Sequence, residues 1–266
     1  MNRVNVYIDG YNFYHGLKKM RKNDPDYQQF YWLDFVKFFD HFILRGQTLH
    51  KVYYFSAIDH DPERNARQKI LFRANKIINE NRLEIIYGKY YPKNVKCKLC
   101  TGLYKIHEEK RTDVNICAYM MSDCANNNVD DIMLVTADSD LVTPIEIIRK
   151  NYPDKQLRLF FPPEVSSRDL TNVMKAIKKL PIQLIKHKQK FVNSLLPETV
   201  SKDGFTYTIP QKWKNTYIKP TPTTTPTTYL TDLYEKHFGK SQTIEHNHPN
   251  MTSFVNDLNA FIFQTP

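Results

Sequence analysis

The sequence has few cysteines and no long apolar run. Four cysteines among 266 residues are too few for a disulfide scaffold, so we expect reduced thiols or a metal site. No apolar stretch approaches the length needed to cross a membrane, and the first one, Val4–Ile8, is too short for the core of a signal peptide. These absences predict a cytoplasmic protein with no membrane partner.

Size and charge narrow the class of partner. A chain of 266 residues accommodates one large α/β domain with an appendage, or two small domains. Its net charge of +10 and isoelectric point near 9.2 favour a polyanionic partner over a neutral metabolite. Evenly solvated lysines are the alternative explanation.

Strand-like and helix-like segments alternate over residues 1–180. Short apolar runs typical of buried strands occur at Val4–Ile8, Val52–Ser56, Leu83–Tyr87, Ile132–Thr136 and Leu157–Phe161. Helical spacing or capping signals predict helices over Trp32–Leu44, Glu63–Asn79 and Asp113–Ala125, and another that starts near Leu141. This order predicts an α/β domain at 1–180 with a mainly parallel sheet and helices on both faces.

Two regions depart from the alternation. Residues 88–111 have the pattern of a protruding hairpin inserted into the α/β core. After residue 180 we expect a C-terminal extension at 181–218, an extended Pro/Thr linker at 219–228 and a tail segment at 229–266. The tail has apolar residues at helical spacing, so we expect it to dock on its own domain, on a second copy or on a protein partner.

Acidic residues follow two of the predicted strands. Asp9 comes directly after Val4–Ile8, and Asp138 and Asp140 follow Ile132–Thr136. Because parallel strands present their chemistry at their carboxyl ends, these carboxylates are expected at one edge of the sheet. Each close pair would repel by about 4 kcal/mol at an effective dielectric of 20, so the group needs a cation, a basic substrate or raised pKa values. Mg²⁺ or Mn²⁺ meets that need, whereas turn and helix caps are the structural alternative.

Three segments together resemble the signatures of the NYN domain family, in order and spacing. They are Asp9-Gly10-Tyr11-Asn12, Glu109-Lys110-Arg111-Thr112-Asp113-Val114 and Thr136-Ala137-Asp138-Ser139-Asp140-Leu141. The family belongs to the PIN-like superfamily of metal-dependent nucleases, so the resemblance implies a PIN-like three-layer fold. The last signature often has glycine where this chain has Ala137, and often an aromatic residue where it has Leu141. Both differences leave the acids intact.

The resemblance also implies the site chemistry. The metal ligands, and thus the catalytic residues, would be Asp9, Asp113, Asp138 and Asp140, with Asn12 in support. Taken alone, Asp113 has the place of a first-turn helix acid. One or two Mg²⁺ or Mn²⁺ ions would activate water for attack on a phosphodiester.

Basic and aromatic residues suggest contacts to nucleic acid. Lys110 and Arg111 lie in the segment that contains Asp113. They can hold a substrate phosphate, or form a solvated pair beside two glutamates. The predicted helix Glu63–Asn79 carries a second basic set, whose alternative is a solvated helix face. Tyr90 and Tyr91 can stack on exposed bases or pack within the hairpin.

The cysteine pattern supplies half of a zinc site. Cys97 and Cys100 have the spacing of a zinc knuckle, and His107 can add a third ligand, but no second pair exists. A structural Zn²⁺ and a reduced thiol pair are the two interpretations. Cys117 and Cys124 are expected to be apolar side chains of a helix.

The leading hypothesis is a cytoplasmic metal-dependent endoribonuclease that hydrolyses RNA. An RNA-binding or regulatory module of the same fold, acting through a partner, is the alternative from another class. A phosphatase of the haloacid-dehalogenase type is the rival enzyme, because its signature also has two aspartates one residue apart. Here the threonine expected at the end of that signature is missing, and the motif lies in the middle of the chain.

Overall fold

The computed structural model describes residues 1–96, 103–214 and 234. Cys97, Cys100, the predicted linker and all of the tail except Tyr234 therefore lie outside the described residues, as does the side chain of His107. The prediction of a zinc site and the docking of the tail stay predictions.

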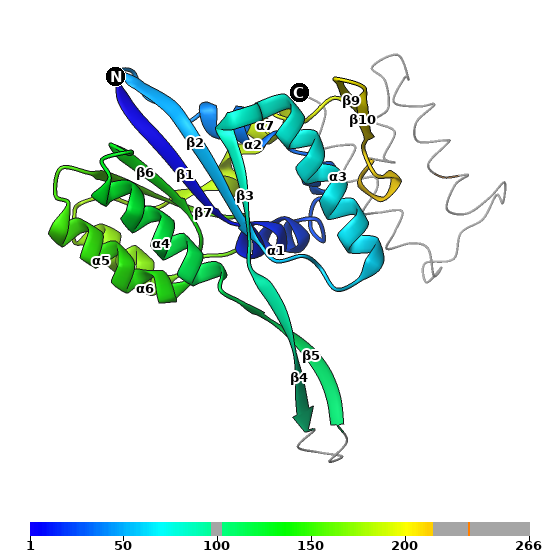
Figure 1. The fold of residues 1–266 in the computed structure, drawn as a ribbon, viewed down its shortest axis with the longest axis horizontal. Helices are drawn as coiled ribbons and strands as arrows, with labels where there is room; N and C mark the ends of the chain where they lie inside the picture. Colours follow the sequence, from blue (N-terminus) through cyan, green and yellow to red (C-terminus); the bar gives the residue numbers. More distant parts are fainter. Residues whose placement is uncertain (97–102, 215–233, 235–266) are drawn as a thin grey trace. The chain divides into compact units, whose positions relative to one another are not determined.

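A six-stranded parallel sheet forms the centre of the fold (Figure 1), in the order β3-β2-β1-β6-β7-β8. The strands are β1 (Asn2–Asp9), β2 (Gln47–Ser56), β3 (Leu83–Tyr87), β6 (Asp131–Val135), β7 (Gln156–Phe161) and β8 (Ile182–Gln183). All five apolar runs are strands of this sheet, as predicted. Every residue of β6 is buried, which explains why that strand is a continuous apolar run rather than an alternating one.

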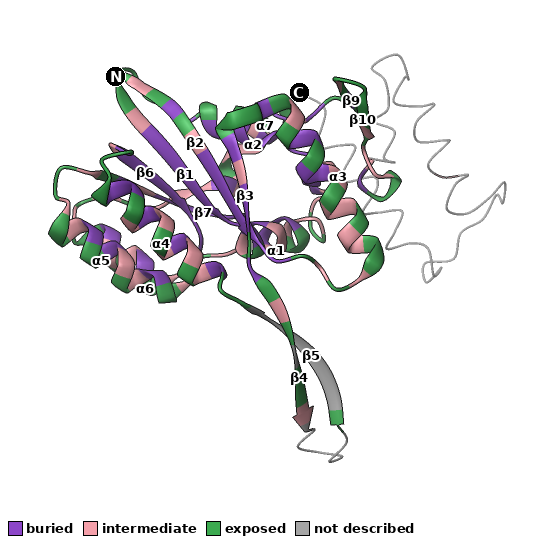
Figure 2. Cartoon of the chain, in the orientation of Figure 1, coloured by how far each residue is buried: buried purple, intermediate pink, exposed green. Residues whose placement is uncertain are grey.

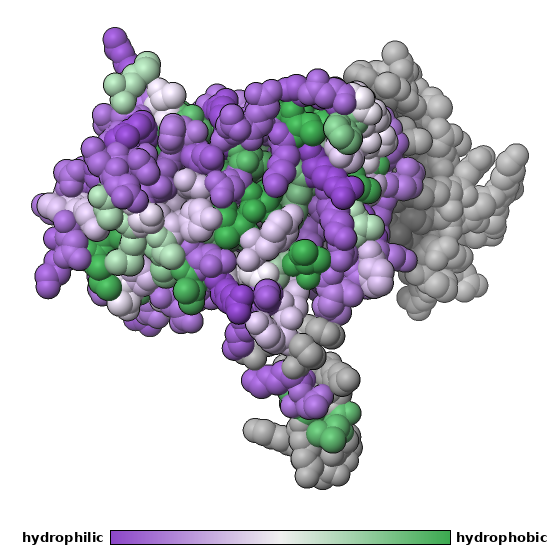
Figure 3. Space-filling model, viewed as in Figure 1, coloured by the Kyte–Doolittle hydropathy of each residue, from purple (hydrophilic) through white to green (hydrophobic). Residues whose placement is uncertain are grey.

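Helices cover both faces of the sheet, which gives the three layers expected for a PIN-like fold. One face carries α1 (Gly10–Met20), α2 (Phe35–Asp40), α3 (Pro62–Asn79) and α7 (Lys188–Asn193); the other carries α4 (Thr112–Ala125), α5 (Val142–Asn151) and α6 (Arg168–Lys175). Val4, Val6 and Ile8 of β1 point into the first core and Tyr7 into the second, the alternation expected of a strand. Figure 2 shows the buried sheet between helices whose outer sides are exposed, and Figure 3 shows mostly hydrophilic residues on the viewed face, with hydrophobic ones gathered near its middle.

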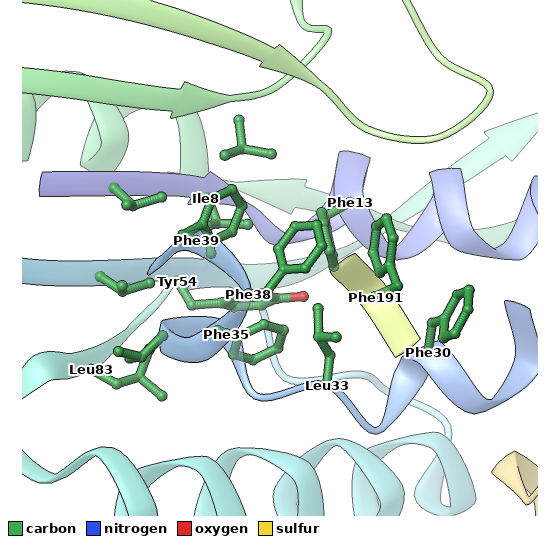
Figure 4. Packing of buried hydrophobic residues seen from close by; sticks show 14 of the residues in the cluster. Ile8, Phe13, Phe30, Leu33, Phe35, Phe38, Phe39, Tyr54, Leu83 and Phe191 are labelled. Atoms are coloured by element: carbon green, nitrogen blue, oxygen red, sulfur yellow. The ribbon is translucent and has the colours of Figure 1, made fainter. Parts of the chain in front are cut away.

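The first core is rich in phenylalanine (Figure 4). Phe191 of α7 contacts the rings of Phe13, Phe30 and Phe38 at centroid separations of 6.3, 5.1 and 4.3 Å. Trp213 is also buried there, 5.6 Å from Tyr31 between ring centroids. The chain up to Trp213 thus packs on the same core as the sheet.

The predicted helix Trp32–Leu44 is wrong in its extent. A 3-10 helix, η1, spans Pro25–Tyr31, and the α-helix that follows covers only Phe35–Asp40. Leu33 instead forms a β-bridge with Leu195, and the Asp34 side chain caps α2 by accepting the Lys37 backbone N–H. The apolar pattern there reflects burial on several sides, so it could not locate the helix start. The other three helix predictions are confirmed by α3, α4 and α5.

The predicted hairpin is present and projects from the body of the fold (Figure 1). Its antiparallel strands are β4 (Lys89–Lys96) and β5 (Leu103–Lys110). A β-carbon at Gly88 would lie 2.6 Å from the Thr112 hydroxyl and 2.8 Å from the Lys110 carbonyl, so only glycine fits this close approach at the hairpin base. The root of the hairpin is therefore pressed against the start of α4.

The remaining elements are short. They are β9 (Thr199–Lys202), β10 (Phe205–Thr208) and the 3-10 helices η2 (Glu80–Arg82), η3 (Ser139–Leu141), η4 (Leu184–His187) and η5 (Gln211–Trp213). Among the described residues, no helix has both the length and the apolar character required for a membrane span.

Candidate functional site

Asp9 lies at the junction of β1 and α1. It is the last residue of the strand and the N-cap of the helix: its Oδ1 accepts the Asn12 backbone N–H at 3.0 Å, and its Oδ2 accepts the Asn12 side-chain amide. A β-carbon at Gly10 would lie 2.4 Å from the Phe55 carbonyl, so the turn from strand to helix requires glycine here. The carboxylate is thus held in place from both ends of Asn12, the residue predicted to support it.

Thr136 connects Asp9 to the next strand. Its side chain is fully buried, and its hydroxyl donates to Asp9 Oδ2 at 2.9 Å while accepting the Asp138 backbone N–H at 3.0 Å. Because β1 and β6 are paired neighbours, this one hydroxyl joins the carboxyl ends of two strands. The sequence predicted the adjacent acids but not this role for Thr136. The one local signal for this role is that Thr136 is a polar residue at the end of a buried apolar run.

Burial makes the Asp9 carboxylate costly. The side chain is 2% exposed, and this desolvation raises its pKa to about 6, despite hydrogen bonds from Asn12 and Thr136 that lower it. The negative charge of Asp113 raises the pKa further. Asp131, by contrast, is a buried acid paired with Arg158 at 3.1 Å. The charged group near Asp9 is therefore another acid, whereas the one that pairs with Asp131 is a base. A bound cation would relieve the repulsion between the two acids.

The other three predicted ligands differ in exposure. Asp113 is half-buried in the first turn of α4, within electrostatic range of Asp9. Asp138 is half-buried at the end of β6 and caps η3 by accepting the Asp140 backbone N–H at 3.0 Å. Asp140 is exposed. The geometry thus brings Asp9, Asp113 and Asp138 to one edge and leaves Asp140 at the surface.

The donor set fits a hard divalent cation in its chemistry. Every candidate ligand is a carboxylate, and Asp9 Oδ1 accepts a single hydrogen bond, which leaves acceptor capacity for a metal. Among the described residues, however, no three side chains of His, Cys, Asp or Glu lie close enough together to hold a metal ion. Binding would therefore require the carboxylates to draw together around the ion.

Lys110 and Arg111 are exposed beside this edge. Lys110 ends β5, and Arg111 links the hairpin to α4 in a left-handed conformation with φ of 77°. Such a conformation costs a non-glycine residue roughly 1–2 kcal/mol. Both residues thus stand at the turn that leads into α4, three and two residues before Asp113.

The comparison with protein families agrees with the fold. A model of the NYN domain family matches residues 3–180. The 6-hydroxy-3-succinoylpyridine 3-monooxygenase HspA of Pseudomonas putida is 26% identical over 181 residues, a match that covers 55% of each chain, so the present chain spans about half the length of this curated relative. A crystal structure of a protein of unknown function from Vibrio parahaemolyticus matches with a TM-score of 0.43 and 17% identity, over 65% of this chain and 88% of that one. A likeness at that level has no bearing on function.

Proposed function

The chain belongs to the NYN domain family, and on that premise we propose that it is a metal-dependent endoribonuclease acting in the cytoplasm. The family is nuclease-like in general, which supports a hydrolase. The more specific claim is that the chain hydrolyses phosphodiester bonds of RNA with Mg²⁺ or Mn²⁺. The observation that carries it is the buried Asp9 carboxylate, joined to Asp138 through Thr136 and facing the charge of Asp113.

The protein side chains have distinct roles in this proposal. Asp9, Asp113 and Asp138 would hold the ion, and Asp140 would complete the set if η3 moves toward the edge. Asn12 and Thr136 fix the orientation of Asp9, so this ligand needs little rearrangement when the ion binds. When bound, the ion supplies an activated water and stabilises the leaving oxygen, and the products would carry 5′-phosphate and 3′-hydroxyl ends. Lys110 and Arg111 would hold the phosphate.

A second candidate is an RNA-binding or regulatory module that does not cleave. The exposed Asp140 and the open arrangement of the described carboxylates favour it. Against it, a buried anionic edge repels phosphate unless a cation is present, so a pure binder gains nothing from the arrangement. The oxidation named for the Pseudomonas putida relative is not part of the proposal, because the match covers about half of that protein.

The test is incubation of the purified chain with total RNA in manganese and in chelator. We expect fragments with 5′-phosphate ends in manganese and intact RNA in chelator. If the protein binds RNA but does not cleave it in manganese or magnesium, the RNA-binding module is favoured. Cleavage that proceeds equally in chelator would contradict the metal requirement.

A further inference from the structure

A cavity of about 90 Å³ lies beside the acidic edge, on the first face of the sheet. Gly10 and Tyr11, which directly follow Asp9, line the cavity. The end of β2 and the first half of α3 also line it. Its floor is apolar and includes Phe13, Phe35 and Leu71. A cavity of this size holds water, which a planar ring can replace on binding.

Aromatic rings form much of the cavity wall. Tyr14 contacts Tyr31 at 5.2 Å between ring centroids, and Tyr31 contacts Trp213 at 5.6 Å, so these rings support one another within the fold. Tyr11 is 47% exposed and packs on His15 at 4.2 Å. Tyr90 reaches the same cavity from the hairpin. The wall is therefore built into the fold, and one exposed ring, that of Tyr11, directly follows the Asp9-Gly10 turn.

The charge at the cavity is positive. Arg64 and Arg67 line it with a single carboxylate, Asp59. Burial, and then the charges of Lys18, Lys19 and Arg64, lower the pKa of His15, which disfavours the charged form of that ring. Asp59 lies 3.1 Å from the Arg64 Nε. Arg67 is 16% exposed, and within the described part of the chain its ion pair is with Glu63, at 3.4 Å, a side chain that is 79% exposed. A weak surface pair of this kind leaves the guanidinium able to bind an anion.

We propose that this cavity binds an unpaired nucleotide of single-stranded RNA, with the base against Tyr11 and the aromatic wall and its phosphate on Arg67. The inference rests on the proposed function and specifies its substrate. The shared Asp9-Gly10-Tyr11 turn places the base next to the carboxylates, so a strand held in the cavity presents its neighbouring phosphodiester to Asp9. Aromatic stacking is available for every base, which predicts selection for unpaired strands rather than for a sequence.

Double-stranded RNA does not satisfy the same contacts. Its bases are stacked and paired, so entry of one base would first require its unpairing and unstacking. A duplex should therefore bind through its phosphates alone. This difference separates a built-in base site from a merely basic surface.

The experiment measures binding of the full chain in chelator, where no cleavage occurs. The probe is a fluorescent single-stranded RNA of about twelve nucleotides, compared with its duplex and with a strand of the same length without bases. Tyr11→Ala should weaken binding of the single strand about tenfold, whereas Tyr11→Phe, which keeps the ring, should bind it like the wild type. The strand without bases should bind equally well to both variants. Arg67→Ala should also lower the slope of log affinity against log salt by about 0.7. Arg73→Ala is the matched control, since Arg73 is an exposed arginine of α3 that does not line the cavity.

The outcomes separate the cavity from the nuclease assignment. Equal affinity for single strand and duplex, or unchanged affinity in both Tyr11→Ala and Arg67→Ala, would overturn the proposal even if wild-type protein cleaves RNA in manganese. Loss of binding in the Arg73→Ala control to the same extent would also overturn it. If these variants behave as expected but no metal-dependent cleavage is found, the base site stands and the proposed catalysis fails.

Discussion

The hydroxyl of Thr136 donates to the Asp9 carboxylate at 2.9 Å across two neighbouring strands. The same oxygen accepts the Asp138 backbone N–H, so Thr136 fixes two candidate ligands relative to each other. A hydrogen-bonded partner of this kind sets the orientation of a ligand, and its loss typically lowers metal affinity or activity about tenfold to a hundredfold.

Thr136→Val should therefore impair catalysis more than folding. Valine has nearly the same shape but leaves Asp9 with fewer donors and the Asp138 N–H without its acceptor, at a cost of about 1 kcal/mol in stability. We expect cleavage in limiting manganese to fall about tenfold or more. Thr136→Ser keeps the hydroxyl and should retain most activity. Equal loss in both variants would mean that the hydroxyl is not what matters. Manganese titrations of cleavage rate, with melting curves, measure both effects.

Stability in chelator should depend on the protonation of Asp9. A carboxyl group whose folded pKa is raised stabilises the fold fully below its ordinary value of 3.8, and that contribution is lost as pH rises through about 6. The Asp9→Asn side chain does not titrate. As pH rises from 3.8 to about 6, the stability of the variant relative to wild type should therefore increase, by up to on the order of 3 kcal/mol. Melting temperatures of both proteins across this pH range measure the difference. If the melting temperatures of wild type and Asp9→Asn change in parallel with pH, the pKa of Asp9 is not raised by burial.

Lys110 and Arg111 should contribute to RNA affinity without contributing to stability. Replacement of each by alanine should weaken binding and lower the salt slope by about 0.7 per lost contact on a single strand. For Arg111 a sharper variant exists, because Arg111→Gly removes the charge and also relieves the left-handed backbone at φ 77°. It should melt at or above the wild-type temperature while binding RNA more weakly. Unchanged salt slopes in all three variants would leave both residues as ordinary surface charges.

The chain after residue 218 should be dispensable for cleavage. The part of the core that the structure describes extends to Trp213, whose ring packs on Tyr31. Removal of residues 219–266 should preserve melting and metal-dependent cleavage, while it changes oligomeric state or substrate access. A cut after residue 180 is the contrast, because it removes Phe191 and Trp213 and should prevent folding, since loss of one buried aromatic ring costs about 3–5 kcal/mol. Loss of folding in the shorter truncation would show that the tail completes the core.

Local sequence signals located much of the sheet and its acidic edge. Asp9 and Asp138 follow apolar runs whose length marks them as buried strands, and parallel strand ends meet at one edge. The start of α1 at Gly10 was missed. Glycine is a weak helix former, and the cap of this helix is Asp9 itself, for which the sequence offers a helix cap only as the alternative to a metal ligand. One side chain thus serves as strand end, cap and candidate ligand.

Features made by distant segments could not be predicted in this way. The nearness of Asp113 to Asp9 depends on how α4 packs against the sheet, and the family resemblance, not the spacing, suggested it. The cavity is lined by residues from Gly10 to Trp213, which no local pattern connects. Arg67 belonged to a basic helix that was noted in the sequence, but its 16% exposure and its place at the cavity exist only in the folded chain.

Cleavage by Asp138→Asn in saturating manganese tests the central claim most directly. The substitution removes one carboxylate charge but keeps the shape of the side chain and an oxygen that can cap η3. We expect RNA cleavage under single-turnover conditions to be abolished, while melting in chelator is unchanged or higher because repulsion at the edge falls. A variant that retains the full wild-type rate would contradict the assignment of Asp138, and with it the metal-dependent mechanism proposed for this edge of the sheet.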